Sequence, residues 1–223
     1  EEMVGPLGFT DLDKEGMLTE GFDQLGTMMT SYGAPYYKEH IQAIGGFTVD
    51  ARYRETKLVA PKEVPEKYLK VGEMIEKRYN LHIYKPTRWE LLAKGMGKKI
   101  FELLNETYKD IYGYNDLTPK QIKQYIAQYI PFVNPEFISI IRDHNTPDKK
   151  MIGFGLSIAS LSYALQKTHK GRLLPFGWWH IAKTLFISKK SPIIDLLLIG
   201  VLPEYRSKGA NALLFTDLIP RYL

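Results

Sequence analysis

The residues best suited to chemistry lie near the carboxyl end of the chain, in a turn that follows an apolar run. Residues 193–201 read IIDLLLIGV, and LPEYRSKGANALL follows, with small residues where a helix is predicted to begin. An apolar run without alternation favours a strand buried on both faces at the centre of a sheet. The first N–H groups of a helix lack intrahelical acceptors, and the helix dipole is positive there. The turn is therefore predicted to bind a phosphate or pyrophosphate group.

Two further groups of residues are candidates for catalysis or substrate binding. Asp195 interrupts the apolar run, and a buried carboxylate is costly unless it is paired or hydrogen-bonded. It is either an anchor or base for a substrate, or a structural carboxylate bonded to a lysine or to the backbone. Trp178, Trp179 and His180 form a cluster that either walls a substrate pocket or packs in the core.

No metal site is predicted. An acidic stretch lies near the amino end, but its spacing does not follow the twelve-residue calcium loop. Its members are Asp11, Asp13, Glu15, Glu20 and Asp23. The histidines are scattered, with no pair at ligand spacing, and the chain contains no cysteine. The lack of cysteine excludes disulfides, thiolate ligands and a cysteine nucleophile, and it favours a cytoplasmic location.

Composition and charge exclude several classes of protein. With 44% hydrophobic and 25% charged residues, the 223-residue chain is predicted to be globular and not disordered. The formal net charge of +5 is mild, and lysines are interleaved with glutamates along predicted helices, so no nucleic-acid partner is predicted. The longest apolar run is too short to cross a bilayer, so no membrane partner is predicted.

The elements around the turn predict a mixed α/β sheet of the α+β type with flanking helices. Helices are predicted at 66–79, 89–94, 98–112, 118–129, 160–168 and 175–187. Strands are predicted at 81–86 and in a hairpin over 135–158 that turns at 145–148. Thr118, Pro119 and Gln121 form a capping-box sequence at a helix start. The glycine-rich first 60 residues are predicted to hold strands at 3–7 and 51–59 and a helix at 35–44.

The segment VLPEYRSKGANALLF resembles the pyrophosphate loop of the GNAT superfamily of acyl-CoA N-acyltransferases. The family pattern is Gln or Arg, two residues, Gly, one residue, then Gly or Ala. Arg206 and Gly209 match this pattern, whereas Asn211 departs from it at the last small position. The segments GFTDLDKEGMLTEGFD and GRLLPFGWWH are similar to those of a bacterial group of duplicated GNAT-like proteins.

The resemblance implies a GNAT-like sheet in two related halves, both incomplete in this chain. Residues 1–60 would be the C-terminal part of a first half, and residues 61–66 a linker. Residues 67–223 would be the N-terminal and central part of a second half, including the cofactor loop.

The resemblance also implies transfer of an acetyl or other acyl group from acyl-CoA to an amine on a small molecule or peptide. The pantetheine and thioester would be held by Ile199, Gly200 and Val201. The pyrophosphate would be bound by amides of Arg206, Ser207, Lys208, Gly209, Ala210 and Asn211. Tyr36 or Tyr37 would protonate the leaving thiolate in the first half. The alternative is a non-catalytic GNAT-like module that binds a ligand or a protein, and a homodimer is a candidate assembly for either function.

Overall fold

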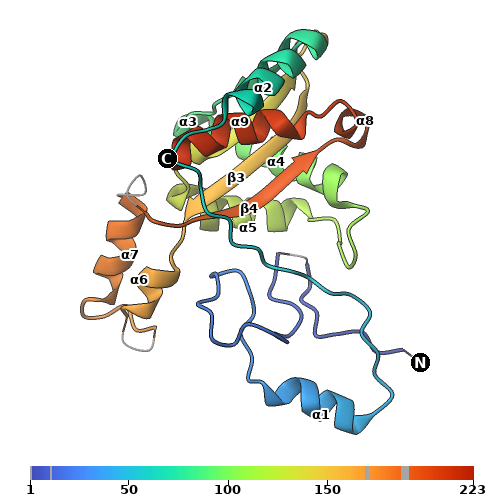
Figure 1. Ribbon diagram of the computed structural model, residues 1–223, viewed down its shortest axis with the longest axis vertical. Coiled ribbons are helices and arrows are strands. Elements are labelled where there is room, and N and C mark those ends of the chain that lie inside the picture. The colour runs from blue at the N-terminus through green and yellow to red at the C-terminus, as the bar shows by residue number, and fades with distance from the viewer. Residues whose placement is uncertain (1, 11, 169–170, 187–190) are drawn as a thin grey trace.

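The computed structural model describes residues 2–10, 12–168, 171–186 and 191–223, and its centre is a four-stranded antiparallel sheet. The strands follow the order β1-β2-β3-β4 in the sheet as well as in the chain (Figure 1). They are β1 (Leu81–Tyr84), β2 (Ile138–Asp143), β3 (Met151–Ala159) and β4 (Ile194–Val201). The predicted α+β class with flanking helices is confirmed, and so is the hairpin, which forms β2 and β3, but every described strand pair is antiparallel, so the predicted mixed sheet is not found.

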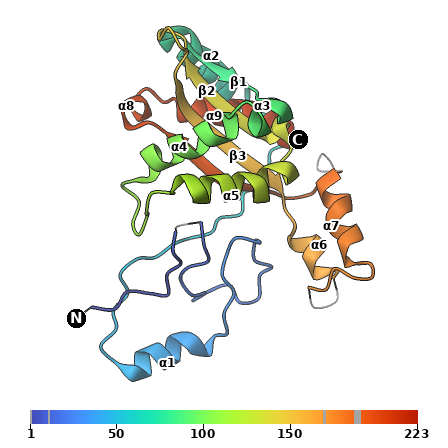
Figure 2. The same ribbon diagram turned by 180° about the vertical axis from the view of Figure 1, so that it is seen from behind.

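Helices cover both faces of this sheet. One face carries α2 (Glu66–Tyr79) and α9 (Asn211–Tyr222), which pack against each other (Figure 1). The opposite face carries α4 (Met96–Tyr108) and α5 (Pro119–Tyr129), as Figure 2 shows from behind. The remaining elements between β1 and β2 are α3 (Arg88–Leu92), η1 (Ile130–Phe132) and η2 (Pro135–Phe137). The core lies between these layers and is dominated by isoleucine and leucine.

Capping boxes start two of the helices on the α4–α5 side. At α5, the Gln121 N–H donates to the Thr118 hydroxyl (3.3 Å), and the Gln121 side chain accepts from the Thr118 N–H (2.9 Å). This predicted cap is confirmed. A second capping box, between Thr87 and Glu90, starts α3 and was not predicted. Each box satisfies two donors that a helix start otherwise leaves without partners.

The sequence placed the apolar run 193–201 at the centre of the sheet, and this prediction is wrong. Among the described strands, β4 pairs only with β3 and lies at the sheet edge. Only its last residues, Gly200 and Val201, are buried, because helices cover both faces there. Its amino end extends past those helices, and Leu196 is 43% exposed. An apolar run indicates that the faces of a strand are covered, but it does not indicate whether a strand pairs with it on one side or on both.

The first 60 residues are largely irregular and lie beside the sheet domain (Figures 1 and 2). The predicted helix is confirmed as α1 (Tyr36–Ile44). The predicted strands at 3–7 and 51–59 are wrong, because no described strand lies beside either segment to bond its backbone. Three hydrogen bonds between described residues join this region to the domain: Thr10 Oγ1 to Tyr125 Oη (3.1 Å), Ser162 Oγ to the Gly26 carbonyl (2.8 Å), and the Tyr112 hydroxyl to the Asp50 carboxylate.

A pair of helices separates β3 from β4. These are α6 (Ser162–Gln166) and α7 (Gly177–Phe186), and they project from one end of the sheet (Figures 1 and 2). The predicted helices at 160–168 and 175–187 therefore exist but are shorter, and Ile187 lies outside the described residues. At the other end of β4, the short helix α8 (Pro203–Arg206) precedes α9.

Replacing Leu214 should test the packing of α9 on the sheet. Its side chain is 0% exposed and faces Gly155 of β3, so Leu214→Ala removes buried methyl groups and leaves a cavity. We expect a loss of about 2–5 kcal/mol in unfolding free energy, measured by urea denaturation. The control Leu58→Ala, at a side chain that is 84% exposed, should change stability little. Equal effects of the two substitutions would contradict this packing.

Candidate functional site

The predicted anion site is the connection between β4 and α9, residues 202–210, which contains α8 and a tight turn. Gly209 adopts φ +73°, a left-handed conformation that residues with a Cβ rarely accept. The turn is closed by bonds from the Gly209 N–H to the Arg206 carbonyl (3.1 Å) and from the Ala212 N–H to the Gly209 carbonyl (2.9 Å). Glycine at this position is therefore required by the backbone of the turn.

The Arg206 side chain holds the connection in place. Its Nε donates to the Val201 carbonyl at the end of β4 (3.0 Å), and its Nη2 donates to the Thr107 carbonyl in the last turn of α4 (2.9 Å). Carbonyls at a helix carboxyl end lack intrahelical partners, and an arginine satisfies them well. The guanidinium therefore has a structural role, which leaves anion binding at this turn to the backbone.

Tyr205 anchors the connection from the other side. Its hydroxyl donates to Asp143 Oδ2 (2.7 Å), while Asp143 Oδ1 accepts from the Asn145 N–H (2.8 Å). Burial and the bond to Asp143 raise the pKa of Tyr205 to about 12. Burial would raise the pKa of Asp143, but hydrogen bonds from Tyr205 and Asn145 outweigh this effect and lower it. Sequence reasoning missed this pair, whose members are 62 residues apart.

The three residues predicted to hold the pantetheine are already engaged within the chain. The Tyr108 hydroxyl donates to the Ile199 carbonyl (3.1 Å) and accepts from the Ile199 N–H (3.2 Å). A Cβ on Gly200 would come within 2.5 Å of Thr107 Oγ1, so this glycine is required for close packing of α4 on β4. The Val201 carbonyl accepts from Arg206. A ligand that paired with the Ile199 backbone would have to displace the Tyr108 phenol.

A β-bulge interrupts β4 between these residues and Asp195. The β3–β4 register pairs Leu156 with Leu198 and Ser157 with Leu196, so within the described residues Leu197 has no partner in the ladder. A bulge leaves the extra residue unpaired and bends the strand. The backbone of Leu197 is therefore the part of β4 best placed to bond a ligand.

Positive charge gathers beside the connection. The Lys208 ammonium lies 4.2 Å from the ring centre of Tyr205 and 5.8 Å from that of Tyr79. The Arg78 guanidinium also lies beside Tyr79, 5.3 Å from its ring centre.

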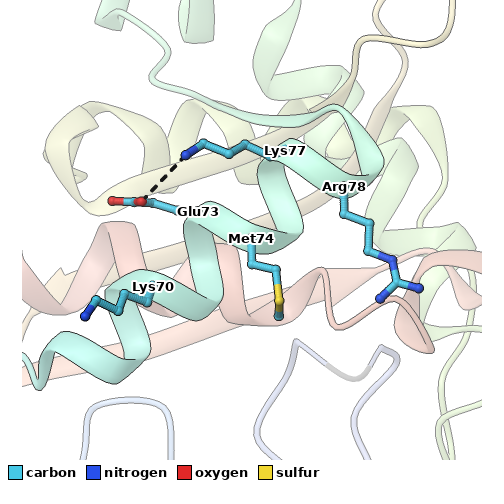
Figure 3. A pocket seen from close by; sticks show the side chains of 5 residues that line it. All are labelled: Lys70, Glu73, Met74, Lys77 and Arg78. Atoms are coloured by element: carbon cyan, nitrogen blue, oxygen red, sulfur yellow. Dashed lines mark ion pairs between the residues drawn. The ribbon is translucent and has the colours of Figure 1, made fainter.

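Arg78 lines a shallow hollow of about 520 Å³ on α2 (Figure 3). The other lining residues are Lys70, Glu73, Met74 and Lys77. Because one helix supplies all five side chains, this hollow is a surface depression and not an enclosed binding site.

Asp195 lies at the amino end of β4, six residues from Val201 at its carboxyl end. At about 3.3 Å per residue, the two are roughly 20 Å apart. Burial raises the pKa of Asp195, and a hydrogen bond from Ser160 partly offsets this rise. The sequence did not predict this influence of Ser160 on the carboxylate.

The predicted tyrosines lie apart from the connection. Tyr36 and Tyr37 sit on α1, with ring centres 4.7 Å apart, and both side chains are about half exposed. In both views α1 is on the far side of the molecule from α8 (Figures 1 and 2). The described structure does not bring either tyrosine to the predicted cofactor loop.

The Trp178, Trp179 and His180 cluster lies on α7, at the opposite end of β4 from α8 (Figures 1 and 2). Trp178 lines an apolar hollow of about 570 Å³ together with Arg88, Phe132 and Leu185. The Trp179 side chain is more than half exposed, and α7 has no buried residue, so core packing does not explain the cluster. The hollow does not adjoin the predicted cofactor loop.

No group of three or more histidine, aspartate or glutamate side chains among the described residues is arranged to hold a metal ion. Asp11 of the acidic stretch lies outside them. No helix within the described residues is both long enough and apolar enough to cross a membrane.

Comparison with protein-family models, curated proteins and solved structures gives no match for this chain.

Tyr205→Phe should test the anchor of the connection. The substitution leaves the buried Asp143 carboxylate without one donor, which should cost about 1.5–3 kcal/mol at pH 7. The folded-state pKa of Tyr205 is raised, so its contribution is complete below about pH 10 and is lost as the pH rises toward about 12. Urea unfolding should therefore show a smaller difference between wild type and variant at pH 11 than at pH 7.

The half-exposed Tyr163 provides the control. Tyr163→Phe should change stability little at either pH. A Tyr205→Phe effect that is the same at pH 7 and pH 11 would contradict the assigned bond.

Proposed function

We propose that this chain carries an acyl-CoA-dependent N-acyltransferase site of the GNAT type, in which the β4–α9 connection binds the pyrophosphate of acyl-CoA. The observation that carries the proposal is the turn itself. Gly209 adopts a left-handed conformation two residues before Asn211, the first residue of a twelve-residue helix. The first amides of that helix are therefore presented at the carboxyl end of a strand, where an anionic group can bind them.

The start of α9 is suited to an anionic ligand because it has no cap of its own. Helices α3 and α5 begin with capping boxes, whereas α9 has Ala210 at its N-cap and no hydrogen bond from a capping side chain in the described structure. The Ala212 and Leu213 N–H groups donate to the Gly209 carbonyl (2.9 Å) and the Ala210 carbonyl (3.1 Å), so in the described structure the N–H groups of Ala210 and Asn211 are the ones left for solvent or a ligand. The helix dipole, Lys208 and Arg78 all contribute positive potential at this end.

The topology supports a GNAT-like half over residues 67–223. The family order is a strand, two helices, a hairpin, a central strand, then the loop and a helix. Here three helices, α3, α4 and α5, separate β1 from the β2–β3 hairpin, and β4 then leads into the loop and α9. The α6–α7 pair is an insertion in this scheme. Residues 1–60 remain assigned by proposal to a first half.

The distances along β4 fit an extended acyl-CoA arm. The connection at one end of β4 and Asp195 at the other are roughly 20 Å apart at about 3.3 Å per residue, comparable with an extended pantetheine arm. A thioester at the far end of the arm would lie near the unpaired backbone of Leu197. A backbone N–H that bonds the thioester oxygen stabilises the oxyanion as the amine attacks.

In this proposal the amine nitrogen attacks the thioester carbonyl carbon, a tetrahedral oxyanion forms, and the C–S bond then breaks. The amine loses a proton, and the CoA thiolate takes one up. Asp195 lies two residues from Leu197, and its raised pKa makes it a stronger base than an ordinary aspartate. We therefore assign Asp195 as the candidate base for the amine.

One observation favours the alternative, a non-catalytic GNAT-like module that binds a ligand or a protein. The Tyr108 phenol occupies both backbone groups of Ile199. A module that binds only the nucleotide part of acyl-CoA, or a protein, would leave this contact intact. Transfer of an acyl group would require the arm to run along the same stretch of β4.

Binding of acetyl-CoA tests the site. Asn211→Glu places a carboxylate in the first turn of α9, where it favours the helix but repels pyrophosphate. We expect isothermal titration to show acetyl-CoA binding by the wild type and at least about tenfold weaker binding by the variant, since 1.4 kcal/mol of lost attraction is tenfold. The matched control, Gln124→Glu at an exposed position of α5, should bind like the wild type.

Two results would overturn the assignment. If the wild type shows no heat of binding at millimolar acetyl-CoA, the acyltransferase proposal fails. If wild type and Asn211→Glu bind equally, acetyl-CoA binds elsewhere.

Asp195→Asn tests the assigned base. Release of free CoA thiol from acetyl-CoA in the presence of a panel of primary amines should fall by a factor of about 10²–10⁴ in kcat. The dissociation constant for acetyl-CoA should not change, because Asp195 is remote from the pyrophosphate turn. Exposed Asp116→Asn is the control. Acetyl-CoA binding without thiol release for any amine would favour the non-catalytic module instead.

A further inference from the structure

The α6–α7 projection is strongly cationic. Residues 160–194 contain six lysines and arginines and no aspartate or glutamate. Without this segment the formal net charge of the chain would be −1 instead of +5. Three of these cations lie in described positions, Lys167, Arg172 and Lys183, and all three residues are exposed. Within the described residues, the projection therefore presents three cations and no carboxylate side chain.

The tip of the projection is apolar. The loop that joins α6 to α7 lies at the end of the projection away from the sheet (Figures 1 and 2). In this loop Leu174 is 78% exposed and Phe176 is 76% exposed, and Leu173 is about half exposed. Trp179 follows in the first turn of α7 and also faces solvent. Clustered apolar side chains of this kind on a surface mark a contact site.

The loop backbone is bonded to the start of α7, which holds these side chains outward. The Trp178 N–H donates to the Leu173 carbonyl (2.8 Å), and Trp178 Nε1 donates to the Pro175 carbonyl (3.1 Å). A Cβ on Gly177 would come within 2.1 Å of the Arg172 carbonyl oxygen, so only glycine allows this close approach. The exposure of Leu174 and Phe176 therefore follows from a defined loop conformation.

We infer that the α6–α7 projection docks on an anionic lipid surface, with Leu174 and Phe176 in the interface. Apolar and aromatic side chains at a tip enter the boundary between headgroups and acyl chains, while nearby lysines and arginines bind lipid phosphates. The absence of any acidic residue from 160 to 194 removes the repulsion that such a surface would otherwise meet. This is surface docking without a membrane-spanning helix, and it is independent of the proposed acyl transfer.

Vesicle flotation of the full chain tests the inference, with phosphatidylcholine vesicles and with vesicles that also contain phosphatidylglycerol. We expect binding to the anionic vesicles, weaker binding to neutral ones, and a loss of binding at high salt. Leu174→Ser with Phe176→Ser should lower the partition coefficient at least tenfold. Arg172→Glu with Lys183→Glu should do the same.

Matched double variants elsewhere on the surface control for general effects. Leu58→Ser with Val59→Ser removes two apolar side chains that are 84% and 91% exposed, outside the projection. Lys120→Glu with Lys123→Glu reverses two exposed charges on α5. Both should bind vesicles like the wild type, and circular dichroism should show that every variant is folded.

Three results would overturn the inference. The first is no binding of the wild type to anionic vesicles at low salt. The second is unchanged binding by the Leu174→Ser, Phe176→Ser variant. The third is a dimer in vesicle-free buffer that this variant converts to a monomer, because the tip would then be a contact between protein chains.

Discussion

The arrangement of the candidate site depends on the guanidinium of Arg206. Its two bonds join the last residue of β4 to the last turn of α4, so one side chain fixes the connection to both layers. Tyr205, its neighbour, fixes the same connection to the β2–β3 turn through Asp143. With both sides held, the start of α9 is presented in a single orientation. This is the preorganisation that binding of an anionic group by backbone amides requires.

The middle of α9 is held by a second polar network, centred on Asp217. The Lys85 ammonium lies 2.7 Å from Asp217 Oδ2 and also donates to the Glu136 carbonyl (2.8 Å). Burial would raise the pKa of Asp217, but hydrogen bonds from Arg221, Lys85 and Ser139 outweigh this effect and lower it. Burial lowers the pKa of Lys85 despite the ion pair. Because its charge is compensated within the group, this network explains the position of α9 and not a chemical activity.

The features that could be predicted from the sequence are those that depend on residues close together in the chain. The bounds of α2 and the capping box of α5 follow from periodicity and from spacing over one turn, and both are confirmed. The prediction of a strand at 51–59 is wrong because alternation of polar and apolar residues shows only that a segment could pair with another strand. In the described structure no strand lies beside it. The site was harder to predict for a related reason. Arg206 could be assigned to the turn, but its bond to Thr107 spans 99 residues and leaves no mark in the local sequence.

Tyr108 also reduces the tendency of the protein to aggregate through the edge of its sheet. An edge strand with free N–H and C=O groups is a template for pairing with the edge of another chain, which leads to aggregation. The Tyr108 phenol occupies both groups of Ile199, and Arg206 occupies the next outward carbonyl, at Val201. The two side chains thus block pairing of another strand with these backbone groups at the exposed edge of β4. A ligand that displaced Tyr108 would have to bond the Ile199 N–H and carbonyl itself to keep this edge blocked.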